Sequence, residues 1–196
     1  ASLMLCDGIH PVFDVSPLEH VGDALDMRLP NASPLPEVRE HIQRQAAALM
    51  AKHHCVFLGG DHSVTLSLLR AARERHGQPL ALLHFDAHCD TWVDHFGEPS
   101  GHGTWTYEAI QEGLADRYGS LDIDVLDPAF APGTGTPEPG GLSSSQVLTF
   151  LEGLADLNWI GMDCVEVAPA YDHAELTSNA AACFVWTYLA GQVAKR

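Results

Sequence analysis

The stretch LALLHFDAHCD, residues 80–90, decides the fold, because an apolar run passes directly into alternating aspartate and histidine residues. Residues 80–85 are predicted to form a buried β-strand. In an extended chain, side chains at every second position point to the same side. Asp86, His88 and Asp90 can therefore converge where the chain leaves the strand. Carboxylate and imidazole groups in this pattern predict a metal site at the carboxyl end of the strand.

Three further polar clusters lie next to apolar runs: GGDHS (residues 59–63), GHGT (residues 101–104) and SLDIDVLDP (residues 120–128). Asp122 and Asp124 repeat the alternation of the first cluster. Four carboxylates placed together repel one another strongly unless cations lie between them. A mixture of imidazole and carboxylate suits Mn, Fe, Co, Ni or Zn better than Ca or Mg. The number of ligands favours two ions, which typically lie about 3.5–4 Å apart and activate a shared water.

Each cluster also has a plainer interpretation. An Asp-x-Asp pair at a strand end is often a turn or a helix cap, and His62 could be a loop histidine without a ligand role. His102 could simply be exposed between its glycines, and Glu166 could only cap or pair. The combination of clusters at several strand ends favours the metal site, because ligands of open α/β sheets bind outside the carboxyl ends of the strands.

Strands and helices alternate along the chain. This alternation predicts an α/β fold of three layers, α/β/α, in which helices cover both faces of a mainly parallel sheet. One domain spanning residues 1–196 is expected, with an irregular segment over 1–36 that includes a short strand at 21–27. The other predicted elements are strands at 55–58, 80–85, 121–126 and 159–167, and helices at 37–52, 64–76 capped by Ser63, 105–115 capped by Thr104, 143–154 and 175–194.

The composition limits the classes of partner. The net charge of −16 argues against binding to nucleic acid or to an anionic membrane surface and favours a small cationic substrate. No apolar run approaches the roughly 20 residues of a membrane-spanning helix. The opening residues ASLMLCDG lack the basic and apolar regions of a signal peptide.

The five cysteines are odd in number and include no C-x-x-C pair. Free thiols, mostly buried, in a reducing compartment explain them, so we expect a cytoplasmic protein. Cys89 lies between two candidate ligands, and its side chain is therefore expected to point away from the metal site.

Five runs together resemble the ureohydrolases, the arginase and agmatinase family, with the closest similarity to bacterial agmatinases. These runs are GGDHS, FDAHCD, GHGT, SLDIDVLDPAFAPGTGTPEPGGL and GMDCVEVAPAYDHAELTSNAAA. The resemblance extends from about residue 15 onward. It implies an arginase/deacetylase-like fold and manganese-dependent hydrolysis of a guanidino compound by a metal-bridging hydroxide. Agmatine is the expected substrate, with urea and putrescine as the products.

The resemblance also assigns roles to individual residues. It implies two Mn²⁺ ions per chain, and a trimer or hexamer. His102 corresponds to a loop histidine that shuttles a proton beside the leaving amine, and Glu166 corresponds to the carboxylate that receives the guanidinium group. The implied ligands are His62, Asp86, Asp90 and Asp122 for one ion, and His88 and Asp124 for the second, with Asp86 and Asp122 bridging.

The sequence is shorter than the family pattern in two places. The strand that opens the family fold would precede Ala1, and family members carry a long stretch between the positions of Arg117 and Tyr118. These departures leave two alternatives to an agmatinase. One is a ureohydrolase for a guanidino acid, such as a guanidinobutyrase, and the other is a metal-binding but inactive truncated homologue.

Overall fold

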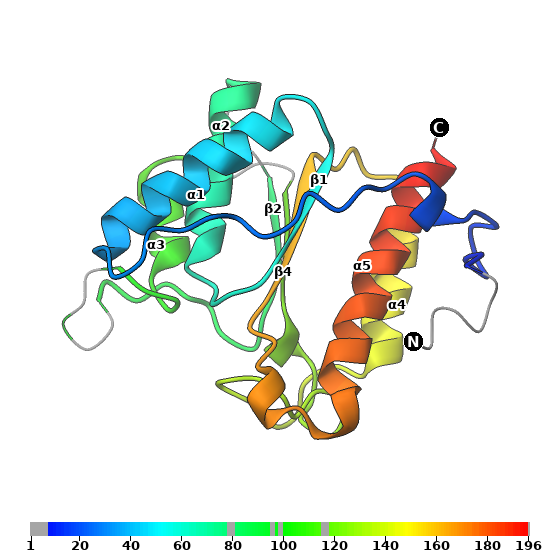
Figure 1. Cartoon of the computed structure of the whole chain (residues 1–196). Helices are drawn as coiled ribbons and strands as arrows, with labels where there is room; N and C mark the ends of the chain where they lie inside the picture. The colour runs from blue at the N-terminus through cyan, green and yellow to red at the C-terminus, as the bar shows by residue number, and fades with distance from the viewer. Residues whose placement is uncertain (1–7, 78–80, 95–96, 98–99, 115–117, 196) are drawn as a thin grey trace. The chain divides into compact units, whose positions relative to one another are not determined.

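The structure is a computed structural model that describes residues 8–77, 81–94, 97, 100–114 and 118–195 (Figure 1). The chain divides into two compact units. One comprises Asp26–Asp122 and Trp159–Glu166, and the other comprises Ala1–Leu25, Ile123–Asn158 and Val167–Arg196. Four positions used in the predictions lie outside the described residues: Cys6, Leu80, Ala115 and Arg117.

A parallel sheet forms the centre of the first unit. Its four strands are β1 (Cys55–Leu58), β2 (Leu82–Phe85), β3 (Tyr118–Asp122) and β4 (Gly161–Val165). They run in the order β1-β4-β3-β2, and every pairing is parallel. All four strands therefore end at the same edge of the sheet, which is where the polar clusters of the sequence begin. The prediction of a parallel α/β sheet is confirmed.

The helices of this unit are α1 (Leu35–Met50), α2 (Val64–His76) and α3 (Trp105–Gln111). In α1, apolar residues at a spacing of four are buried, as expected of an amphipathic helix. Helix α2 is buried over most of its length and packs against α1. Its leucines join Tyr118 of β3 in the hydrophobic core, which anchors the loop between β1 and α2.

The second unit contains α4 (Ser144–Gly153) and α5 (Leu176–Ala194), which pack together. Helix α4 begins at a capping box, in which the Ser143 side chain accepts from the Gln146 amide and the Gln146 side chain accepts from the Ser143 amide. This unit also contains a short 3₁₀ turn, Ile123–Val125. None of the described helices is long and apolar enough to cross a membrane.

Several predictions of local structure were wrong. Residues 21–27 form no strand, because they pair with no described strand and residues 21–26 are exposed, which leaves no face to bury. The predicted strand at 121–126 already ends at Asp122 and continues as the 3₁₀ turn. Ser63 and Thr104 occupy the N-cap positions as predicted, but neither side chain forms a capping hydrogen bond. The Asp61 carboxylate instead accepts a hydrogen bond from the Ser63 amide, at 2.8 Å.

Candidate active site

The candidate site of the first unit lies at the carboxyl ends of its strands. Asp86 follows β2 directly, Asp122 is the last residue of β3, and Glu166 follows β4 directly. His62 comes from the loop between β1 and α2. Parallel pairing brings these ends together, because strand ends of the same sense share one edge of the sheet.

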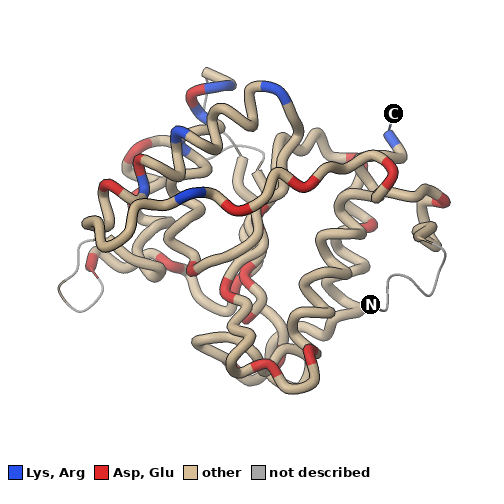
Figure 2. The backbone as a smooth tube through the Cα atoms, in the orientation of Figure 1, with Lys and Arg blue, Asp and Glu red and all other residues tan. Residues whose placement is uncertain are grey.

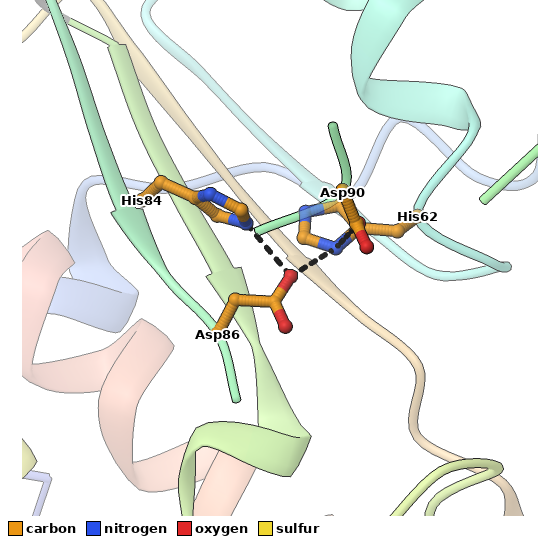
Figure 3. A group of neighbouring side chains, drawn as sticks. All are labelled: His62, His84, Asp86 and Asp90. Carbon is orange, nitrogen blue, oxygen red and sulfur yellow. Dashed lines mark hydrogen bonds and ion pairs between the residues drawn. The ribbon is translucent and has the colours of Figure 1, made fainter. Parts of the chain in front are cut away.

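Three carboxylates surround one nitrogen of the buried His62 ring. Nδ1 lies 3.0 Å from Asp86 Oδ2, 3.2 Å from Asp90 Oδ2 and 3.0 Å from Asp122 Oδ2. Figure 3 shows His62 and His84 on either side of the Asp86 carboxylate, with Asp90 beside the His62 ring. The structure thus brings four of the predicted ligands to one point.

The protonation of His62 depends on these neighbours. Burial alone would lower its pKa, but the carboxylates of Asp122, Asp86 and Asp90 outweigh burial and raise the pKa to about 12. Even so, Nδ1 is buried and forms no hydrogen bond of normal geometry within the described part of the chain. A ring nitrogen with several carboxylate oxygens around it and no directed hydrogen bond fits a bound divalent cation, which needs donors from many directions.

Asp86 contacts three histidines. The His84 ring lies 2.7 Å from its Oδ2, and Oδ1 accepts a 2.6 Å hydrogen bond from the His88 amide and lies 3.3 Å from His88 Nδ1. Burial would raise the pKa of Asp86, but its contacts with His62 and His84 lower it, so the carboxylate is ionised. An anion among imidazoles can act as a bridging ligand.

Asp90 reaches the site by a route that differs from the prediction. Its φ of +51° lies in the left-handed region, so the D-x-H-x-D run is not extended throughout. The start of α3 holds this conformation. The Trp105 indole donates to Asp90 Oδ2 at 2.7 Å, and the Thr106 amide donates to the Asp90 carbonyl at 3.1 Å. Cys89, next to it, is exposed, as expected of a side chain that points away from the site.

The two candidate catalytic residues lie close to each other. Glu166 Oε1 accepts a 2.7 Å hydrogen bond from the His62 amide, and His102 Nδ1 lies 3.9 Å from the same oxygen. Burial raises the pKa of Glu166, against the effect of the His62 amide. The φ of Glu166 is +63°, a strained backbone that is frequent at functional sites. His102 is more exposed, with 41% of its side chain accessible.

Asp124 belongs to the second unit. It lies in the 3₁₀ turn two residues after Asp122 and is buried. Its Oδ2 accepts a 3.1 Å hydrogen bond from the Thr136 hydroxyl. The 3₁₀ turn ends the alternation that the sequence suggested.

Basic residues are unevenly distributed along the chain. Residues 118–194, which supply β3, β4 and the segments that follow them, contain no Lys or Arg. Figure 2 shows Lys and Arg mainly along α1, α2 and their flanking segments, and at the C-terminal end. Asp122 of β3 lies beside His62, and Asp163 of β4 accepts hydrogen bonds from Ser120 and Thr65.

Three polar residues near His62 were missed by the sequence analysis. His84 shares a possible metal-binding group with His62, Asp86 and Asp90. It could have been found, because it extends the alternation before Asp86 by one step. Ser120 and Asp163 could not, since they lie within apolar strands and their partners depend on the register between β3 and β4.

The chain is similar to known proteins of one family. The sequence matches the arginase family over residues 7–118 and 116–191. The two matched stretches meet where the sequence analysis expected a family segment to be missing. An agmatinase of Chromobacterium violaceum is 42% identical over 194 residues, a stretch that takes in 75% of this chain. The chain covers 59% of the length of that relative.

Solved structures show the same fold. The match to a hypothetical agmatinase from Burkholderia thailandensis covers all of this chain and 78% of the agmatinase chain, with a TM-score of 0.87 and 34% sequence identity. The match to the proclavaminate amidino hydrolase of Streptomyces clavuligerus covers 87% of this chain and 74% of the hydrolase chain, with a TM-score of 0.79 and 34% sequence identity. On the sequence match and on these likenesses together, the chain belongs to the arginase family.

Proposed function

We propose that this chain hydrolyses agmatine to urea and putrescine at a site for two manganese ions. The observation that carries the proposal is the position of the buried His62 Nδ1 within 3.2 Å of three carboxylate oxygens. Family membership supports the reaction class, and the agmatinase of Chromobacterium violaceum supports the substrate.

The proposed ligands are the six residues of the sequence analysis, and they fit a divalent ion of intermediate softness. His84 lies 2.7 Å from Asp86 and would orient that carboxylate. When bound, a pair of such ions supplies hydroxide near neutral pH and compensates the charge of the carboxylates. The first ion would be held by His62, Asp86, Asp90 and Asp122, and the second by His88 and Asp124 together with Asp86 and Asp122.

Glu166 would bind the guanidinium group of the substrate. An ionised carboxylate pairs with a planar guanidinium through charge-assisted hydrogen bonds. Burial raises the pKa of Glu166, so a cationic substrate would favour its ionised form by lowering that pKa again. The absence of Lys and Arg from residues 118–194 also favours a cation near this part of the chain.

His102 would deliver the proton that the leaving amine requires. Its partly exposed ring can exchange protons with solvent, and histidine is the side chain that most often serves as a general acid or base. Its Nδ1 lies 3.9 Å from Glu166 Oε1, so a guanidinium held by Glu166 would lie beside the ring. A His102→Asn variant should bind manganese normally and release urea much more slowly.

A second candidate substrate class is a guanidino acid. The proclavaminate amidino hydrolase, at 34% identity, is an observation that favours it, because its name describes action on a different amidino compound. Urea release from agmatine, guanidinobutyrate and guanidinopropionate, measured side by side, tests the choice. Faster release from agmatine supports the proposal, and faster release from an acid overturns it.

The alternative of an inactive homologue predicts bound metal without urea release from any compound in that panel.

We further propose that the chain forms one ureohydrolase domain, that it is cytoplasmic, and that it assembles as a trimer or hexamer. Sedimentation velocity of the manganese-loaded protein tests the assembly, and a monomer would overturn that part of the proposal.

A further inference from the structure

The second nitrogen of the His62 ring, Nε2, is the first member of a chain of hydrogen bonds that the proposed reaction does not use. His62 Nε2 lies 2.8 Å from Ser120 Oγ, and Ser120 Oγ donates to Asp163 Oδ1 at 2.8 Å. Thr65 Oγ1 donates to the other oxygen of Asp163 at 3.0 Å. All four side chains are buried, so water cannot replace a missing member.

The sheet places this chain. Ser120 of β3 and Asp163 of β4 are register partners, so their side chains lie next to each other on the same side of the sheet. Asp122 lies two positions after Ser120 and points to that side as well. One strand therefore contacts both nitrogens of the His62 ring, Nε2 through Ser120 and Nδ1 through Asp122.

The number of hydrogens decides the direction of each bond. A serine hydroxyl has one hydrogen, and an ionised carboxylate can only accept. Because Ser120 gives its hydrogen to Asp163, its oxygen must accept from His62 Nε2–H. In a ring with a single proton, Nδ1 then carries a lone pair, which is the form of histidine that binds a metal. Ligand histidines almost always donate their other ring N–H in this way.

We propose that Ser120 and Asp163 are positioning residues that hold His62 as the Nε2–H tautomer and thereby present Nδ1 to the metal ion. The inference rests on the proposed metal centre, but not on the identity of the substrate. Neither Ser120 nor Asp163 is among the proposed ligands or substrate contacts, so both would act through His62, which Ser120 contacts directly.

Manganese affinity tests the inference without reference to turnover. Loss of a group that orients a ligand histidine typically weakens metal binding by about 10–100-fold. We expect a loss of this size in Ser120→Ala and in Asp163→Asn, measured from the electron paramagnetic resonance signal of free Mn²⁺ during titration. Unchanged affinity in both variants would overturn the inference.

Ser67→Ala is the matched control. Ser67 lies on α2, is as buried as Ser120, and its hydroxyl has no hydrogen-bond partner among the described residues. Its replacement removes the same atom from a buried serine, and manganese affinity should not change. An equal loss of affinity in Ser67→Ala would show that the effect of Ser120→Ala is general packing damage, and would overturn the inference.

Nitrogen-15 spectra of histidine-labelled protein loaded with diamagnetic Zn²⁺ observe the tautomer directly, even if Ser120→Ala does not fold. The inference predicts a protonated Nε2 and a metal-bound Nδ1 for His62, assigned by the loss of its signals in His62→Asn. A metal-bound Nε2 would overturn it. If wild type bound no metal, the metal centre and this inference would fail together. Normal metal binding without urea release would contradict the proposed reaction only.

Discussion

Replacement of His62 by asparagine tests the charge balance of the site in the metal-free chain. Without metal, the protonated ring contacts Asp86, Asp90 and Asp122 at once, because each carboxylate lies within 3.2 Å of Nδ1. Asparagine keeps a polar group of smaller size but removes the charge. Three buried or largely buried carboxylates would then repel one another with no cation between them.

The expected loss of stability is large. Removal of one partner from a buried ion pair costs about 3–5 kcal/mol. For a protein of this size, each kcal/mol lowers the melting temperature by roughly 2–4 °C, so a decrease of about 6–20 °C is expected in the presence of a chelator.

The pH dependence should change as well. The pKa of His62 is raised from its ordinary value of 6.5 to about 12 in the folded chain. A raised pKa gives stability that is fully present below pH 6.5 and is lost as the pH rises toward 12. In wild type without metal, the free energy of unfolding should therefore fall between pH 6.5 and 9 by up to about 1.4 kcal/mol per pH unit. His62→Asn should lack this slope.

Urea-induced unfolding in EDTA at several pH values measures both effects. His102→Asn is the matched control, because it makes the same substitution at a more exposed histidine and should leave stability nearly unchanged. The reasoning is refuted if His62→Asn loses less than about 1 kcal/mol, the ordinary effect of a point mutation, or if it keeps the wild-type pH slope.

Three further outcomes are expected. Manganese at 100 times its dissociation constant should stabilise the wild type by about 2.7 kcal/mol per site, seen as a melting temperature roughly 5–11 °C higher, and no shift would contradict a folded metal site. A thiol reagent at pH 8 should modify the exposed Cys89 but should reach Cys164 only after unfolding, since burial raises the pKa of Cys164 to about 12. Mass spectrometry of the modified peptides measures which cysteine reacts first, and early modification of Cys164 would contradict its burial. Gly161→Ala should lower the free energy of unfolding by about 1–3 kcal/mol through overpacking, because an added Cβ would lie 2.9 Å from the Tyr118 ring. An unaltered midpoint of urea unfolding would contradict that packing.

The bounds of an element could be predicted from the sequence where a single strong local pattern determined them. The apolar run of β1 and the pattern of α2 were predicted with the bounds that the structure shows, 55–58 and 64–76. The strand predicted at 121–126 begins at Tyr118 and ends at Asp122 in the structure. Its end was placed too late because Ile123 and Val125 are apolar and alternate with Asp122 and Asp124. These apolar residues are buried in a 3₁₀ turn, and alternation cannot distinguish this turn from a strand.

The site shows the same limit. The alternating aspartates and histidines after β2 are a local signal, so Asp86 and His88 could be proposed as ligands from spacing. The partnership of Ser120 with Asp163 depends on the register of two strands that lie far apart in sequence. Such a pair is visible only after the strands are aligned, because each residue alone looks like an isolated polar position in a buried strand.

Urea release from agmatine by the manganese-loaded chain, with the bound manganese counted on the same sample, tests the central claim most directly. The account predicts urea together with about two manganese ions per chain. Two ions without urea would contradict the proposed activity and favour an inactive homologue. Urea release at the same rate after complete removal of manganese would contradict the metal centre itself.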